Sequence, residues 1–224
     1  SDYFPKSFFI KTGDFRFNQG KMWFQKFDAA YGKTNVSLNG YLYNIIDYAM
    51  NENAPLAGQF NLSSNHLYAD EFMAYAGDTS ASEGNSSGVI IIPSNLNIKL
   101  KAAIKQISYE SLTLNNFSGG VSMNNGSLIL DTTAFELIGA RVKMNAAYKT
   151  LSPTKASFDY NIDAENFDVK RAYNEIKIFH DLATSASKAE GIVSLKYQLS
   201  GQLNDEMKPV YPSLKGNGVL SLQD

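Results

Sequence analysis

Apolar and polar residues alternate with a period of two along most of the chain, and this pattern predicts β-strands. The clearest run is "SNLNIKLKAAI", where apolar residues occupy every second position and Asn97, Lys99 and Lys101 lie between them. A second long run, "GIVSLKYQLSGQL", follows the same rule, and shorter runs such as "DFRFNQ", "SLTLNNF", "SLIL" and "ARVKMNAAY" continue it. We therefore predict a mainly β fold in which repeated antiparallel strand units form a curved sheet or groove.

Turn signals separate these runs. The triplet 124–126, Asn-Asn-Gly, stands between two alternating segments, and Asn-Gly tolerates the positive φ that a tight hairpin requires. "NENAP" and "LSPT" predict two further turns. In "KTNVSLNGYLYN" the alternation shifts at Asn39 and Gly40, and a shift beside a glycine predicts a β-bulge.

One stretch predicts an amphipathic helix. From Asp168 onwards, apolar residues recur mostly three or four positions apart and form a single stripe. The stripe comprises Val169, Ala172, Tyr173, Ile176, Phe179, Leu182, Ala183 and Ala186. Asp168 is the expected N-cap and Gly191 the expected stop. We predict one principal helix over about 168–189.

The chain also contains an internal similarity. Segment Gly58–Tyr75 aligns with Ala156–Tyr173 without a gap, an offset of 98, and "VSLNGYLYN" aligns with "VKMNAAYKT" at an offset of 106. This pattern predicts a first β repeat unit over 1–76, a flexible Gly/Ser-rich loop over 77–88, and a second unit with the helix and the C-terminal strands over 89–224. The alternative is that any two amphipathic β-hairpins look alike.

Composition limits the classes of function. With 224 residues, 44% of them hydrophobic, the chain can bury a sizeable core. Its net charge of −2 provides no basic field for nucleic acid, and the absence of cysteine excludes disulfides and thiolate chemistry. The sequence has no apolar run long enough for a transmembrane helix and no signal peptide. Because it opens abruptly with "SDYFPKSFFIKTGDF", we expect an internal piece of a longer protein.

Candidate chemical groups are few. His66 and His180 have no serine, cysteine or acidic motif at a recognisable catalytic spacing. The acidic set Asp159, Asp163 and Glu165 fits a calcium loop poorly, since "DYNIDAENFD" contains no glycine. A paired-carboxylate hydrolase stays open, but the favoured interpretation is that these residues face solvent on a strand, beside a helix cap. The sequence therefore predicts no catalytic residue, no metal site and no cofactor, and hence no enzyme.

A glycine-punctuated motif closes the chain. "G-x-x-S-x-x-x-x-L-x-G" is followed, after a spacer, by "S-L-x-G-x-G-x-x-x-L". The matching residues are Gly191, Ser194, Leu199 and Gly201, then Ser213, Leu214, Gly216, Gly218 and Leu222. With this motif, segment 166–224 resembles the C-terminal region of the AsmA family. "ESLTLNNFSGGVSMNNGSLIL" and "GKTNVSLNGYLYN" are similar to the β repeats of that family.

The resemblance implies a non-enzymatic role in outer-membrane biogenesis in the cell envelope of Gram-negative bacteria. It implies a periplasmic β groove that carries lipid between membranes. An inner-membrane anchor would lie upstream of this chain. The partners implied are phospholipid or another envelope lipid, and other envelope proteins; nucleic acid is not expected.

The apolar rows are the candidate groove. A sheet with one apolar face must cover it with a helix, a second sheet or a ligand, and a helix from Asp168 can cover only part. The lipid-groove candidates are Leu96, Ile98, Leu100 and Ile104 in one row, and Val193, Leu195, Tyr197 and Leu199 in the other. Two alternatives stay open. The rows pack as a closed core, or the chain is a carbohydrate-binding or adhesive β module of a bacterial surface protein, which would expose rings such as Trp23 on a polar face.

Overall fold

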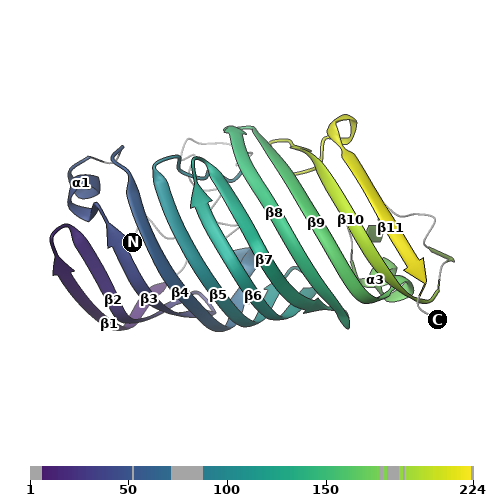
Figure 1. Ribbon diagram of the computed structural model, residues 1–224, viewed down its shortest axis with the longest axis horizontal. Coiled ribbons are helices and arrows are strands. Elements are labelled where there is room, and N and C mark those ends of the chain that lie inside the picture. Colours follow the sequence, from purple (N-terminus) through teal and green to yellow (C-terminus); the bar gives the residue numbers. More distant parts are fainter. Residues whose placement is uncertain are drawn as a thin grey trace.

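Eleven strands form one open sheet whose strand order follows the chain (Figure 1). A computed structural model describes residues 7–51, 53–71, 88–176, 179–180, 187–188 and 190–222. The strands are β1 (Phe8–Asn18), β2 (Lys21–Tyr31), β3 (Thr34–Tyr43), β4 (Leu56–Tyr68), β5 (Leu96–Tyr109), β6 (Leu112–Asn124), β7 (Ser127–Leu137), β8 (Ala140–Ser152), β9 (Lys155–Asp168), β10 (Ile192–Leu203) and β11 (Lys215–Leu222). Neighbouring strands are antiparallel except β4 and β5, which are parallel. The predicted mainly β, largely antiparallel fold is confirmed.

One face of this sheet is apolar. Residues paired across neighbouring strands lie on the same face, so the registers assign each side chain to a face. The face that carries Ile98 and Val193, here called the inner face, holds no Asp, Glu, Lys or Arg within the eleven strands. The opposite, outer face carries charged residues such as Lys99, Lys101 and Asp159. The period-two alternation of the sequence therefore separates an uncharged face from a polar one.

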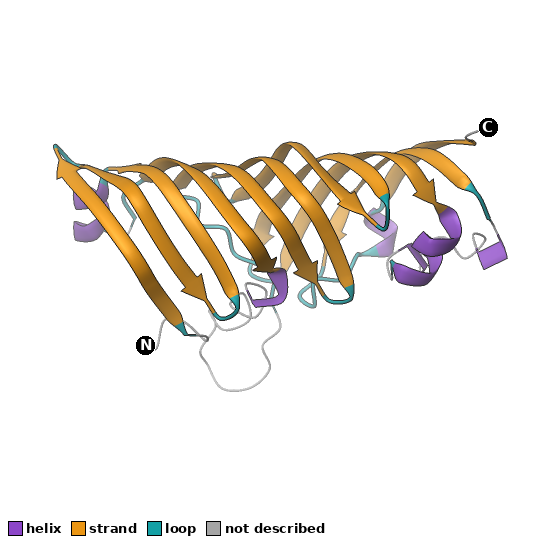
Figure 2. Cartoon of the chain, turned by 90° about the horizontal axis from the view of Figure 1, so that it is seen from below, coloured by secondary structure: helices purple, strands orange, loops and turns teal. Residues whose placement is uncertain are grey.

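The helices and the longer connections lie on one side of the sheet, beneath it in Figure 2. They include α1 (Ile45–Met50), α3 (Val169–Glu175) and the described end of the β4–β5 connection, 88–95. The buried residues of α3 join Phe135, Val142 and Val193 in the main hydrophobic cluster. The inner face is therefore the covered face, and α3 covers the part of it near the ends of β7 to β10.

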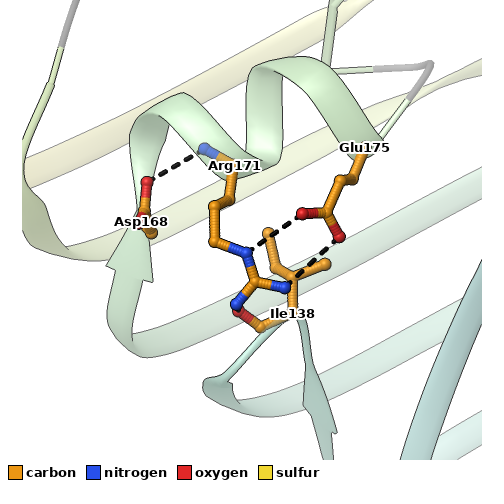
Figure 3. Close-up of polar contacts among 4 residues, drawn as sticks. All are labelled: Ile138, Asp168, Arg171 and Glu175. Atoms are coloured by element: carbon orange, nitrogen blue, oxygen red, sulfur yellow. Dashed lines mark hydrogen bonds and ion pairs between the residues drawn. The ribbon is translucent and has the colours of Figure 1, made fainter.

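Helix α3 is fastened at its first turn (Figure 3). The Asp168 carboxylate accepts a hydrogen bond of 2.9 Å from the Arg171 backbone N–H, which confirms the predicted N-cap. The Arg171 guanidinium donates to the Ile138 carbonyl oxygen, 2.8 Å away in the β7–β8 turn, and pairs with Glu175 at 3.0 Å. These contacts hold the helix against the strand ends.

The expected length of this helix was wrong. The described helix ends at Glu175, and Ile176 adopts an extended conformation with φ −106° and ψ 101°. Ile176 is buried in the hydrophobic cluster, and the turn resumes beyond it, because the His180 N–H donates to the Ile176 carbonyl oxygen. Packing of this β-branched side chain thus takes precedence over helix continuity. Gly191 does not stop α3, and the rest of 168–189 lies largely outside the described residues.

Strands of the two predicted repeat units match in their irregularities. β2 begins at 21 and ends at 31, β7 begins at 127 and ends at 137, and both ends therefore differ by 106. The turn before β2 has φ values of 50° and 74° at Gln19 and Gly20, and the turn before β7 has 47° and 73° at Asn125 and Gly126. Such matching is what a duplicated unit predicts. Nearly all of the predicted 77–88 loop lies outside the described residues.

The β-bulge that was predicted at Asn39 and Gly40 of β3 occurs beside these residues, but in the paired strand β2. β3 pairs with β4 without a register shift, so Asn39 and Gly40 continue the alternation of β3. The register between β2 and β3 shifts between Phe24 and Phe27, and the corresponding shift in β7 lies between Leu130 and Thr133. The extra residue therefore belongs to β2 and to β7, and both Phe24 and Phe27 face inward.

We expect Asp168→Ala to lower the free energy of unfolding by about 1 kcal/mol, because the first turn of α3 loses its side-chain acceptor. Urea denaturation measures this loss. Asp159→Ala is the matched control, since Asp159 is exposed on the outer face of the same strand, β9. Equal stability losses in the two variants would contradict a capping role for Asp168.

Candidate functional site

A single row of residues crosses the inner face of all eleven strands in unbroken register. Each strand contributes one residue, and none of them carries a charge. The row, here called the central row, consists of Phe15, Phe24, Gly40, Phe60, Leu100, Val121, Leu130, Ala146, Tyr160, Leu199 and Gly216. With strands about 4.8 Å apart, it is about 48 Å long.

Most of the central row is accessible, whereas parts of the inner face further along the strands are covered. Within it, only Leu199 is buried, and the other members are half-buried or exposed. On one side, the Ile90 carbonyl oxygen accepts hydrogen bonds from the Tyr148 and Thr150 hydroxyls, so segment 88–95 lies over that part of β8. On the other side, the α3 cluster contacts Val142, further along the same strand. At β8, the central row therefore runs between two covered parts of the inner face.

The predicted groove residues lie on the inner face but differ in accessibility. Both predicted rows face inward, one on β5 and one on β10, with four strands between them. Four are buried, namely Ile98, Ile104, Val193 and Leu199. The other four are half-buried, namely Leu96, Leu100, Leu195 and Tyr197. Only Leu100 and Leu199 belong to the central row, which runs across the strands and not along them.

An exposed apolar part of the inner face lies on β1 to β4. Phe15 and Phe17 on β1 are 47% and 51% exposed. The Phe15 ring lies 5.2 Å from that of Phe24 and 5.8 Å from that of Phe27, and Phe24 in turn lies 5.4 Å from Phe60. These contacts form an aromatic surface at one end of the central row. The sequence analysis recognised the alternation of "DFRFNQ" on β1, but it missed Phe24 and Phe27 because the bulge in β2 disturbs the alternation there.

Most polar groups on the inner face have partners within the chain. The Thr133 hydroxyl donates to the Met144 carbonyl oxygen, and the Thr34 hydroxyl donates to the buried Glu71 carboxylate at 2.9 Å. Tyr160 and Tyr197 differ, because neither hydroxyl has a hydrogen-bond partner among the described residues. Their rings lie 6.3 Å apart.

Burial raises the pKa of Tyr160 to about 12, and the neighbouring Tyr197 adds to the shift. An unfolded tyrosine ionises near pH 10. As pH rises from about 10 to about 12, the unfolded state loses this proton before the native state does, so the free energy of unfolding should fall. The hydroxyl stays neutral, and remains a donor, at neutral pH.

We expect Tyr160→Phe to flatten part of this alkaline loss, since phenylalanine has no proton to release. Urea denaturation of both proteins at pH 7 and at several values between 10 and 12 measures the slope. An identical decline in wild type and variant would contradict a raised pKa at this position.

The outer face contains His66 and the acidic residues that were weighed for catalysis, whereas His180 follows α3, with its ring 4.6 Å from that of Tyr173. His66 Nε2 lies 2.8 Å from the Ser108 hydroxyl, a pair that sequence spacing did not reveal because the residues are 42 positions apart. Among the described residues, no carboxylate bonds the other ring nitrogen of His66, as the orienting group of a triad would. Asp163 pairs with Lys196 at 3.6 Å, and Asp159, four residues away on the same strand, is about 13 Å distant. This spacing separates the two carboxylates too far to share one ion.

No group of three or more histidine, cysteine or acidic residues suited to a metal ion occurs in the described part of the chain. Trp23, Tyr41 and Tyr43 do gather on the outer face. The Lys21 ammonium lies 3.7 Å from the Trp23 ring centre and 3.9 Å from that of Tyr41, so the chain's own cation occupies this cluster. The rings meet edge to face and offer no flat platform for a sugar.

Among the described residues, no helix is both long and apolar enough to cross a membrane. No protein-family model matches the chain, and comparison with curated proteins finds no significant match.

Proposed function

We propose that this chain is a non-catalytic domain of an AsmA-like protein that holds or conducts lipid along its inner face. The observation that carries the proposal is the central row. It is uncharged across eleven strands, is accessible apart from Leu199, and at β8 runs between two covered parts of the inner face. Acyl chains are the chemical class that gains most from such a surface, since each methylene removed from water contributes about 0.8 kcal/mol.

The length of the row supports a conduit better than a closed pocket. A row of about 48 Å exceeds the hydrocarbon core of a bilayer, which is about 30 Å thick. One acyl chain spans about half of that core. The row therefore has room for acyl chains along its course, and its exposed aromatic end on β1 to β4 provides a place of entry.

The cellular setting is part of the same proposal. A periplasmic domain in Gram-negative outer-membrane biogenesis, anchored to the inner membrane through an upstream segment, would need a surface of this kind. This part rests on the resemblance of segment 166–224 to the AsmA family. Phospholipid or another envelope lipid is the proposed ligand, and other envelope proteins are the proposed partners.

Lipid analysis of protein purified without detergent tests the proposal. We expect mass spectrometry to find co-purified acyl lipid, and we expect delipidated protein to bind a fluorescent phospholipid. Protein that contains no lipid and binds none would contradict the lipid function. Sugar binding by such lipid-free protein would instead favour the carbohydrate-binding or adhesive module.

A further inference from the structure

We infer that the hydroxyls of Tyr160 and Tyr197 form a hydrogen-bonding station in the groove that recognises the ester carbonyl oxygens of an acyl-ester lipid. The inference rests on the proposed lipid function and names the substrate class. Tyr160 belongs to the central row, and Tyr197 lies beside it on β10. Both side chains are half-buried, so a ligand in the groove can reach them.

The surrounding geometry keeps these hydroxyls available. The Tyr160 ring stacks on Phe158 at 6.1 Å and lies 6.3 Å from the Tyr197 ring, which fixes the pair on the inner face. The Tyr197 ring leans over the glycines of β11. A β-carbon at Gly218 would lie 2.8 Å from the ring, and one at Gly216 would lie 3.3 Å from the hydroxyl. The glycines at positions 216 and 218 therefore leave room for the Tyr197 ring and leave open space beside its hydroxyl.

Tyr148, another inner-face tyrosine, does not offer the same chemistry. Tyr148, the next inward residue beyond Ala146 on β8, donates to the Ile90 carbonyl oxygen at 2.8 Å. Tyr160 and Tyr197 make no such bond within the described residues. Neither hydroxyl is among the buried unpartnered side-chain atoms of the described residues, so both remain open to an acceptor that a ligand brings into the groove.

Charge selects the kind of acceptor. The inner face of the strands has no Lys or Arg, so a carboxylate or phosphate at this depth would lack a counter-ion. A neutral ester carbonyl accepts hydrogen bonds without that cost. The acyl chains and the ester group would thus occupy the groove, while a charged headgroup stays at its rim. This arrangement favours ester-linked lipids over hydrocarbons and over ionised fatty acids.

Two matched probes test the station. One is a fluorescent diacyl phosphatidylglycerol, and the other is its dialkyl ether analogue, which has the same chains and headgroup but no ester carbonyl. We expect the wild-type protein to bind the ester probe about two- to ten-fold more tightly than the ether probe, the range of one neutral hydrogen bond. The variant Tyr160→Phe/Tyr197→Phe keeps both rings and should bind the two probes equally.

The outcomes of this binding experiment distinguish failure of the tyrosine station from failure of the lipid groove as a whole. Tyr43→Phe makes the same chemical change on the outer face and should keep the ester preference. Binding of both probes with equal affinity by wild type, or an ester preference that survives in the double variant, would overturn the station and leave the lipid groove standing. Failure of wild type to bind either probe would overturn both proposals. The single Tyr→Phe variants provide the same comparison if the double variant does not fold.

Discussion

Gly40→Ala is expected to lower the free energy of unfolding by at least about 3 kcal/mol. Gly40 lies in the central row between Phe24 and Phe60, where the chain of β3 approaches β4 closely. A β-carbon there would lie 2.1 Å from the Gln59 carbonyl oxygen and 2.7 Å from the Phe60 α-carbon. Both are backbone atoms and cannot move without separating the strands. The φ of +154° adds backbone strain for any L side chain.

Gly191→Ala separates these two causes. Gly191 also has a positive φ, +131°, but a β-carbon there would meet no atom within 4 Å. Urea denaturation should therefore show a loss of about 1 kcal/mol for Gly191→Ala, from strain alone, and a much larger loss for Gly40→Ala. Similar losses in the two variants would mean that the close approach of β3 and β4 is not what requires glycine at position 40.

Phe15→Asp is expected to leave a folded protein that binds phospholipid at least about ten-fold more weakly. Phe15 is 47% exposed on the edge strand, so the carboxylate can remain hydrated and most of the core is untouched. Its ring is nevertheless part of the aromatic surface with Phe24 and Phe27. A charge at this end of the central row opposes the entry of an acyl chain. Titration with a fluorescent phospholipid measures the change.

Phe9→Asp is the matched control for this test. It makes the same substitution in the same strand, but Phe9 pairs with Ala30 on the outer face and is 63% exposed. We expect Phe9→Asp to bind lipid as wild type does. Equal weakening by both variants would point to a general effect of charge or of β1 stability, and would remove the inner face as the lipid-binding surface.

Regular alternation predicted the strands well where no bulge interrupts it, but it failed at the bulges of β2 and β7. The run around Leu100 and the run around Tyr197 predicted β5 and β10 because neither strand interrupts its own alternation over that length. β2 was not predicted, because the bulge places Phe24 and Phe27 on the same face three residues apart. The same irregularity in β7 explains why only "SLIL" was recognised there. A bulge is defined by how two strands pair, so the sequence of one strand alone does not reveal it.

The sequence predicted which face of the sheet holds the candidate site, but it did not predict the row of residues that crosses the strands. Alternation identified which side chains of β5 share a face, whereas the central row depends on the registers of ten strand pairs. Those registers decide that Leu100 continues to Phe60 on one side and to Val121 on the other. The covers were also beyond local pattern. The positions of residues 88–95 over β8 and of α3 against Val142 depend on long-range packing.

The parallel pairing of β4 with β5 has a consequence for the order of folding. Most strands follow their neighbour through a short turn, so β1 to β4 and β5 to β9 can each assemble by local hairpin closure. The β4–β5 ladder must instead wait for the 69–95 connection to close, and loop closure grows more costly with length. Contacts between residues far apart in sequence also slow folding. The seam between β4 and β5 is therefore where the segments β1 to β4 and β5 to β9 meet, and the surface that crosses both exists only after that late step.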